Sequence, residues 1–326
     1  MRAVWLREFG GPDTLVPGEA PDPRPGPGQV VIEVAVIGIP FVETQVRSGS
    51  APVPLPPLPI IPGNGVGGTV VEAGPGADPA LVGARVVTSL KGSGGYAERV
   101  AADTGGLIPV PPGLELADAV ALLADGRTAM GVMRAAAVQP GEWVLVESAA
   151  GGVGSLLVQL AVNAGARVIA AASSPRKLDL AAGLGAEATV NYTEDGWGAR
   201  VREAAGDAGV RVAFDGVGGA IGRTAFESLA RGGRFLMFGA AGGSLTHATI
   251  AEVFWRGIVL LTGSQFYSSP ADVKAMAEAA LAEAAAGRLR PVIGQTFPLE
   301  RAADAHAAIE ARATLGKTLL TTTEAR

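Results

Sequence analysis

The residues from Trp143 to Gly154, WVLVESAAGGVG, have the types and spacing that bind a phosphate anion. The apolar run Trp143–Val146 predicts a short buried strand, a run of glycines follows it, and the next residues continue as a helix. Glycine lets the backbone approach a phosphate closely, and the N–H groups and dipole of a helix N-terminus favour an anion. This order predicts a dinucleotide site at Ala150, Gly151, Gly152, Val153 and Gly154.

In the dinucleotide fingerprint G-x-G-x-x-G, Ala149 takes the first position, and Gly151 and Gly154 take the other two. By itself this pattern also fits an ordinary tight turn. A second predicted strand at Arg167–Ala171 completes a strand–turn–helix–strand unit, and this context favours the dinucleotide interpretation.

The end of that second strand selects between NADH and NADPH. NAD sites place an acidic residue there to hold the ribose hydroxyls. This chain instead has Ser173 and Ser174, followed by Arg176 and Lys177, with no acid. Hydroxyls and cations favour a 2′-phosphate, so the sequence predicts NADPH. The alternative is that both cations are only solvated, but cations oppose the dipole at a helix start.

The composition of the chain excludes several other classes of protein. At 326 residues it is long enough for about two domains, and its net charge of −5 argues against nucleic-acid binding. There is no cysteine, so disulfides and thiolate metal sites are impossible. The early charges Arg2, Arg7 and Glu8 argue against a signal peptide, and the uncharged stretch Ser148–Ala166 is better explained by the glycine turn than by a membrane span. We expect a soluble cytoplasmic protein.

The elements that position these residues fall into two regions. The first ~120 residues are predicted to be rich in strands, at 30–36, 68–73 and 84–88, with an extended loop from Pro52 to Pro62. After residue 117, strands alternate with helices, which predicts a parallel sheet covered on both faces. The later elements are strands at 143–146, 167–171, 210–214, 234–238 and 258–262, and helices at 176–184 and from Ser269 to Gly287.

The chain also resembles the quinone oxidoreductase (zeta-crystallin-like) branch of the medium-chain dehydrogenase/reductase superfamily. The similar segments are spread over nearly the whole chain. They are Glu8–Pro12, Val42–Gly49, Pro62–Gly63, Gly94–Glu98, Gly126–Ala129, Ala149–Gly154, Ser173–Leu178, Val190–Tyr192, Phe214–Gly219, Gly287–Val292 and Ala303–Ile309.

The resemblance implies an α/β fold in which a Rossmann domain, a doubly wound parallel sheet at 126–263, is inserted into a β-rich GroES-like catalytic domain at 1–125 and 264–326. It also implies reduction of a carbonyl or conjugated double bond by NADPH without zinc. The implied cofactor residues beyond the glycine turn are Ser173 or Ser174, with Lys177 and Tyr192, at the 2′-phosphate, Thr128, Ser264, Gln265 and Phe266 at the nicotinamide, and Val217, Phe238, Gly239, Ala240 and Lys317.

The residue types argue independently against zinc. There is no cysteine, and the two histidines, His247 and His306, lack ligand spacing. We expect both histidines at the surface or at helix caps, and Tyr96 in the core.

The substrate pocket departs from the family pattern. Pro40 replaces an Asn, Glu43 an Asp, and Gln45 a Tyr, and Gly65 stands where an acid is common, so Pro40 and Phe41 predict a more apolar pocket. Thr128, Gln45 or a water would stabilise the developing oxyanion. Glu43 is either a proton relay or an ordinary carboxylate at a helix start.

We therefore expect a reductase that transfers a hydride from NADPH to a quinone, an enone or a related carbonyl compound. An enoyl-thioester reductase on the same scaffold and a non-catalytic NADPH-binding protein are the alternatives. The apolar strand Ile258–Thr262 comes last in the predicted sheet, and it is expected to pair with its twin in a homodimer.

Overall fold

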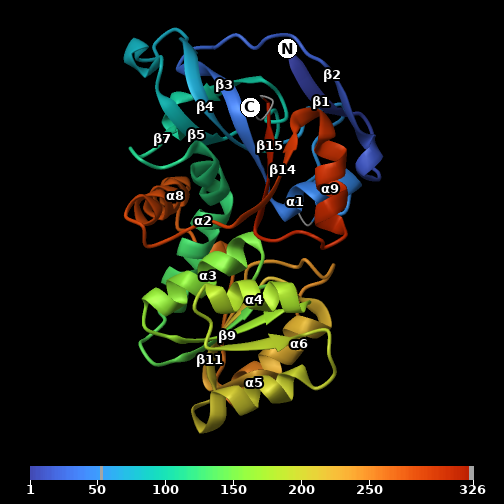
Figure 1. The fold of residues 1–326 in the computed structure, drawn as a ribbon, viewed down its shortest axis with the longest axis vertical. Coiled ribbons are helices and arrows are strands. Elements are labelled where there is room, and N and C mark those ends of the chain that lie inside the picture. Colours follow the sequence, from blue (N-terminus) through green and yellow to red (C-terminus); the bar gives the residue numbers. More distant parts are fainter. Residues whose placement is uncertain (52–53, 323–326) are drawn as a thin grey trace. The chain divides into compact units, whose positions relative to one another are not determined.

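The computed structural model describes residues 1–51 and 54–322, except for the side chain of Ser264. The chain forms two compact units, and Figure 1 shows the elements of each. Unit 1 comprises Met1–Asp125 and Ala280–Arg326, and unit 2 comprises Gly126–Ala279. The sequence predicts that the inserted domain spans residues 126–263. The compact unit in the structure spans residues 126–279, so its second boundary lies further along the chain. The domain limits stay a prediction.

Unit 2 is built on a six-stranded parallel sheet in the order β10-β9-β8-β11-β12-β13. The strand order reverses between β8 and β11, and this reversal is the place where α/β sheets bind ligands. The strands are β8 (Trp143–Glu147), β9 (Arg167–Ala172), β10 (Ala188–Asn191), β11 (Val210–Asp215), β12 (Leu229–Met237) and β13 (Val259–Thr262). The doubly wound sheet is confirmed, and β10 is a strand that the sequence analysis did not identify.

Helices cover both faces of this sheet (Figure 1). One face packs a core of aromatic and aliphatic side chains, including Trp197, Phe226 and Phe235. The helices are α3 (Gly152–Asn163), α4 (Pro175–Gly183), α5 (Trp197–Ala205), α6 (Gly219–Ser228) and α7 (Ile250–Arg256). Two longer helices, α2 (Leu116–Ala136) and α8 (Pro270–Ala285), include the points where the chain passes from one unit to the other.

Unit 1 contains a seven-stranded sheet around an aliphatic core, and β1 (Arg2–Leu6) and β2 (Leu15–Glu19) form a separate pair. The last strand, β15, pairs antiparallel with β3, so the end of the chain completes a sheet begun near its start. The strands of the large sheet are β3 (Gln29–Ile39), β4 (Gly65–Ala73), β5 (Arg85–Ser89), β6 (Arg99–Asp103), β7 (Ile108–Pro109), β14 (Ile293–Pro298) and β15 (Lys317–Thr321). This topology confirms the GroES-like domain that was expected from the resemblance.

Two helices of unit 1, α1 (Phe41–Ser48) and α9 (Ala302–Glu310), carry polar side chains that become important below. The proline loop has no helix or strand at 54–59, as predicted, and Pro52 lies outside the described residues. Within the part of the chain that the structure describes, no helix is long and apolar enough to cross a membrane.

Candidate active site

The predicted phosphate seat lies between β8 and α3. The backbone turns sharply at Ser148, which has a φ of +48°, and the amide of Gly151 donates to the Ser148 carbonyl at 2.8 Å. A Cβ at Gly154 would lie 2.2 Å from that same carbonyl oxygen, so only glycine fits there. Gly151 is the N-cap of α3 and provides no side chain to cap the helix. The first amides of α3 are therefore suited to an anion.

The loops after β11 and β12 form a second glycine-lined part of the crevice. The amide of Gly242 donates to the carbonyl of Val217 at 2.7 Å, and that of Ala241 donates to Gly216 at 3.1 Å. A Cβ at Gly242 would lie 2.8 Å from the Val217 carbonyl, and one at Gly239 would lie 2.8 Å from the Gly216 carbonyl. The predicted residues Val217, Phe238, Gly239 and Ala240 are thus brought together by unit 2.

The residues predicted for a 2′-phosphate meet at the carboxyl ends of β9 and β10. Ala172 lies opposite Asn191 in the parallel pair, which places Ser173 beside Tyr192. The Nζ of Lys177 donates to the Ser173 hydroxyl at 3.2 Å. Ser174 is the N-cap of α4, yet its side chain makes no capping hydrogen bond. The two serines, Lys177 and Tyr192 are half-buried, and Arg176 is exposed.

A third part of unit 2 joins α2 to the segment after β13. The hydroxyl of Tyr267 donates to the Arg127 carbonyl at 3.2 Å, and Arg134 donates to the Phe266 carbonyl at 2.7 Å. Thr128, which follows Arg127, is half-buried. Gln265 is exposed, and its side chain accepts from the Thr262 amide, whereas the side chain of Ser264 lies outside the described residues.

The residues predicted to contact substrate lie on α1 in unit 1. Pro40 is the N-cap of this helix, Phe41 begins it with 37% of its surface exposed, and Gln45 is half-buried. Glu43 lies in the first turn but is buried. A fifth predicted residue of this unit, Lys317, is also buried, and its Nζ lies 3.1 Å from Oδ1 of Asp125.

Glu43 belongs to a buried chain of hydrogen bonds. Its Oε1 accepts from the Asn64 amide at 2.9 Å, and its Oε2 accepts from the Tyr96 hydroxyl at 2.7 Å. The Tyr96 oxygen also lies 2.7 Å from Nε2 of His306 on α9. Burial raises the pKa of Glu43 to about 7, although the hydrogen bonds from Tyr96 and Asn64 and the charge of Lys317 act in the opposite direction. Glu43 is therefore present in both protonation states at neutral pH.

The histidine at the end of this chain corrects one expectation. His306 is fully buried, not at the surface or at a cap, because α9 packs it against Tyr96. Burial and the nearby Arg47 lower the pKa of His306 to about 3, so its ring is neutral. A neutral imidazole accepts from the Tyr96 hydroxyl or donates to its oxygen, and the ring nitrogen that carries the proton decides which of the two it does.

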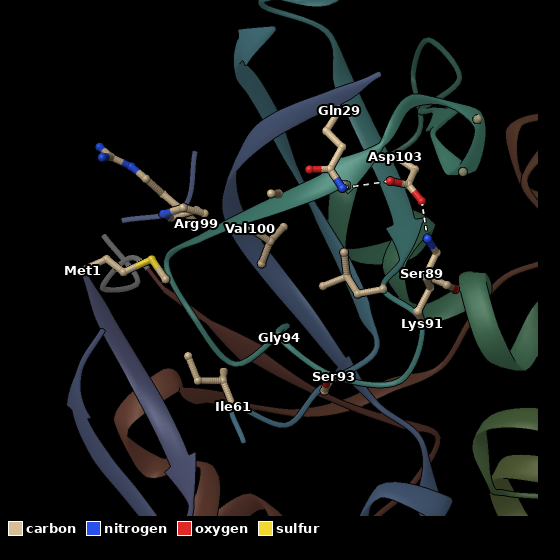
Figure 2. Close-up of a pocket in the computed structure, with 16 residues that line it drawn as sticks. Met1, Gln29, Ile61, Ser89, Lys91, Ser93, Gly94, Arg99, Val100 and Asp103 are labelled. Carbon is tan, nitrogen blue, oxygen red and sulfur yellow. Dashed lines mark hydrogen bonds and ion pairs between the residues drawn. The ribbon is translucent and has the colours of Figure 1, made fainter. Parts of the chain in front are cut away.

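The structure was also searched for metal-binding clusters and for a pocket outside the predicted site. Among the described residues, no group of three or more His, Asp or Glu side chains could hold a metal ion. A hollow of about 550 Å³ in unit 1 contains none of the predicted site residues. Figure 2 shows that three of its polar side chains pair with each other, since Asp103 bonds both Gln29 and Lys91. We therefore do not assign it to the substrate.

The chain is similar to known proteins over nearly its full length. Residues 26–112 match the family "Alcohol dehydrogenase GroES-like domain", and residues 152–282 match "Zinc-binding dehydrogenase". A 2-haloacrylate reductase from a Burkholderia species is 32% identical over 98% of both chains. A quinone oxidoreductase from Pseudomonas aeruginosa is 31% identical over 98% of this chain and 99% of its own.

A solved structure agrees with these sequence matches. The Escherichia coli quinone oxidoreductase, crystallised as a complex with NADPH, superimposes with a TM-score of 0.91 at 27% identity, over 98% of this chain and 100% of the other. The chain belongs to the medium-chain dehydrogenase/reductase superfamily. Within this superfamily of oxidoreductases it falls in the quinone oxidoreductase-like branch, as the sequence resemblance predicts.

Sequence reasoning missed several polar residues of this dehydrogenase/reductase. Tyr96 is in the core, as expected, but its hydroxyl joins Glu43 to His306. Glu147 and Asp215, at the ends of β8 and β11, are both fully buried. One sequence pattern could have pointed to both acids: each ends an apolar strand and is followed by a glycine-containing turn.

Proposed function

We propose that this protein is an NADPH-dependent reductase that transfers a hydride to a quinone, an enone or a related carbonyl compound. The observation that carries the proposal is the cluster at the end of β9, where two serines and Lys177 stand in place of an acid. A carboxylate there would hold the ribose hydroxyls of NADH, whereas hydroxyls and an ammonium suit a 2′-phosphate. The similarity to an NADPH complex supports the same cofactor.

The crevice fits a dinucleotide, because Gly154, Gly239 and Gly242 leave no room for a side chain where backbone segments meet. In this proposal, the amides of the glycine turn hold the pyrophosphate, and Ser173, Ser174, Lys177 and Tyr192 hold the 2′-phosphate. Thr128, Gln265 and Phe266 orient the nicotinamide, and Lys317 is a further proposed cofactor residue. NADPH supplies the hydride when bound, and the protein positions the reactants and excludes water.

The proposal gives Glu43 the role of a proton store for the reduced acceptor. Because its pKa is about 7, Glu43 both holds and releases a proton near neutral pH, as a general acid requires. Thr128 and Gln45 are the proposed donors to the developing oxyanion, and Pro40 and Phe41 line an apolar pocket.

The proposed reaction needs no zinc. Zinc catalysis in proteins relies on three ligands from Cys, His or a carboxylate plus an open position. This chain has no cysteine and two histidines, of which His306 is bonded to Tyr96 and His247 is exposed. We also propose the cytoplasm as its compartment.

The acceptor is tested by following NADPH oxidation with quinones, enones, 2-haloacrylate and enoyl thioesters. Turnover with quinones or enones supports the proposal. A preference for enoyl thioesters would replace it with the enoyl reductase alternative. Tight NADPH binding without turnover on any acceptor would make the protein a binding protein instead.

The cofactor is tested with the variant Lys177→Ala. Loss of one ion pair to phosphate raises the Michaelis constant for NADPH about tenfold and leaves that for NADH unchanged. Lys274→Ala on α8 is the matched control and changes neither constant. Equal effects of Lys177→Ala on both nucleotides would reject the 2′-phosphate assignment.

We further propose a homodimer through β13. This strand is the last one in its sheet, and neighbouring apolar side chains are largely exposed: Ile250 (88%), Phe254 (72%), Trp255 (70%) and Val259 (48%). Pairing of two copies would cover this surface and satisfy the edge of the sheet. Light scattering should give the mass of a dimer, and a monomer would contradict the assignment.

A further inference from the structure

Two carboxyl groups lie side by side at the base of the nucleotide crevice. Val146 pairs with Phe214 across β8 and β11, and the next residues on these strands are Glu147 and Asp215. Both side chains are fully buried. The same backbone amide, that of Val217, approaches Glu147 Oε2 at 3.3 Å and Asp215 Oδ1 at 3.1 Å, so the two carboxyl groups are neighbours.

The donors around the two groups are distributed unequally. Asp215 accepts from the amides of Val217 and Gly218, the latter at 2.7 Å, and from the hydroxyl of Thr246. Glu147 shares the Val217 amide, and its Oε1 has no hydrogen-bond partner in the described structure. Two buried carboxylates this close cannot both be ionised. Glu147, which has fewer donors, keeps the proton of the pair and uses it in a hydrogen bond to Asp215.

The residues next to Glu147 in the sheet and in the following turn carry no charge that would favour its ionised form. On β9 the residue opposite Glu147 is Ala171, and the turn that follows Glu147 is formed by alanine, serine and glycine. Among the described residues, the hydrogen-bond donors to the pair are the amides of Val217 and Gly218 and the Thr246 hydroxyl. Burial and the charge of Asp215 both raise the pKa of Glu147 well above its usual range.

The acid pair is connected to both loops of the crevice. Asp215 fixes the amides of Val217 and Gly218, and the Val217 carbonyl in turn holds the loop after β12. On the other side, a Cβ at Gly222 would overlap Thr246 Oγ1 and lie 2.7 Å from Asp215 Oδ2, so α6 packs directly on the pair. A change in the charge of the pair would therefore act on the loops that shape the nucleotide site.

We propose that Glu147 is a positioning residue for the cofactor: as a neutral acid it holds Asp215 and the Val217–Gly218 loop in place, and loss of its proton weakens NADPH binding. This inference rests on the proposed function. A second negative charge in the crevice would repel the pyrophosphate. This repulsion should lower the affinity for NADPH about tenfold.

The test compares the wild type with Glu147→Gln, which keeps a donor to Asp215 but cannot ionise. The dissociation constant of NADPH is measured by nucleotide fluorescence from pH 7 to pH 10. The variant should match the wild type at pH 7 and should bind about tenfold more tightly than the wild type where Glu147 has lost its proton. Any other group that titrates in this range is present in both proteins, so its contribution cancels from the comparison. Parallel curves would overturn the proposal.

A second measurement uses no nucleotide and so is independent of the proposed function. The unfolded chain releases the Glu147 proton above its ordinary pKa, while the folded protein keeps it, so wild-type stability falls as the pH rises through this window. The melting temperature of Glu147→Gln minus that of the wild type should therefore increase steadily from pH 5 to pH 9. A constant difference would overturn the inference. Failure of NADPH to bind the wild type at pH 7 would instead reject the proposed function.

If Glu147→Gln does not fold, infrared spectroscopy takes its place. The protein used is Glu43→Gln, which removes the other buried acid with a raised pKa. An absorption band of a protonated carboxyl group should persist at pH 8, and its absence would overturn the proposal.

Discussion

Glu43 in unit 1 and Glu147 in unit 2 are both buried carboxyl groups, but their neighbours differ. Glu43 accepts hydrogen bonds from Asn64 and Tyr96 and lies within reach of the positive charge of Lys317. Glu147 shares one weak donor with Asp215 and faces its negative charge. Burial raises the pKa of both groups, to about 7 for Glu43 and well beyond the usual range for Glu147.

The difference shows that burial alone does not decide what a carboxyl group does. Hydrogen-bond donors and a nearby cation lower the pKa of Glu43 to a value at which it exchanges a proton near neutral pH, as a general acid must. A neighbouring carboxylate keeps Glu147 neutral, which suits a structural donor. The unit proposed to hold the substrate and the unit proposed to hold the cofactor thus use the same side chain in opposite ways.

The largest effect is expected from removing Asp215, the member of the acid pair that accepts more hydrogen bonds. Asp215→Ala leaves the Gly218 amide and the Thr246 hydroxyl without their acceptor, and it should lower the free energy of unfolding by about 3–5 kcal/mol. Glu43→Ala should cost about 1–3 kcal/mol, because Tyr96 keeps His306 as a partner. Calorimetry measures both losses, and the reverse order would contradict the comparison.

The second-largest effect is a difference between Glu43 and Glu147 in how the stability of the protein depends on pH. The folded protein holds the Glu43 proton up to a pKa of about 7, whereas the unfolded chain releases it near 4.5. Wild-type stability therefore falls between these values, and relative to Glu43→Gln the loss should reach about 3 kcal/mol. The difference between the two proteins should level off above pH 7. For Glu147→Gln it should still grow there, and identical curves for the two variants would remove the distinction.

The smallest effect tests the Tyr96 hydroxyl, the donor that helps to keep the pKa of Glu43 close to 7. Tyr96→Phe removes a hydrogen bond that favours the ionised carboxylate, so the pKa of Glu43 should rise further, by about one unit. The pH profile of NADPH oxidation should shift upward by the same amount. Tyr267→Phe makes the same chemical change in unit 2 and serves as the control. A lower rate with an unshifted profile would make Tyr96 a packing residue only.

Sequence reasoning reached the nucleotide unit more easily than the substrate unit. The glycine turn and the following strand are local patterns, so Trp143–Val146 and the β9 end could be read directly, and the structure places them as predicted. The Glu43 chain joins residues that are 53 and 210 positions apart in sequence. No local periodicity brings Glu43, Tyr96 and His306 together, because only the sheet topology does so.

His306 and the Glu147–Asp215 pair illustrate the same limit. A histidine on a short helix has no sequence mark of burial, and its neutral state depends on its surroundings in the folded unit. Glu147 ends an apolar strand and would ordinarily be placed at an exposed strand end. Only the parallel pairing of β8 with β11 shows that a second carboxyl group lies beside it.

The most direct test of the central claim is isotope transfer. The protein is incubated with NADPH deuterated at C4 of the nicotinamide and with an α,β-unsaturated ketone, and the reduced product is analysed by mass spectrometry. The account predicts deuterium on the carbon that accepts the hydride. Tight NADPH binding without label in any enone or carbonyl product, and without quinone-dependent NADPH oxidation, would contradict it.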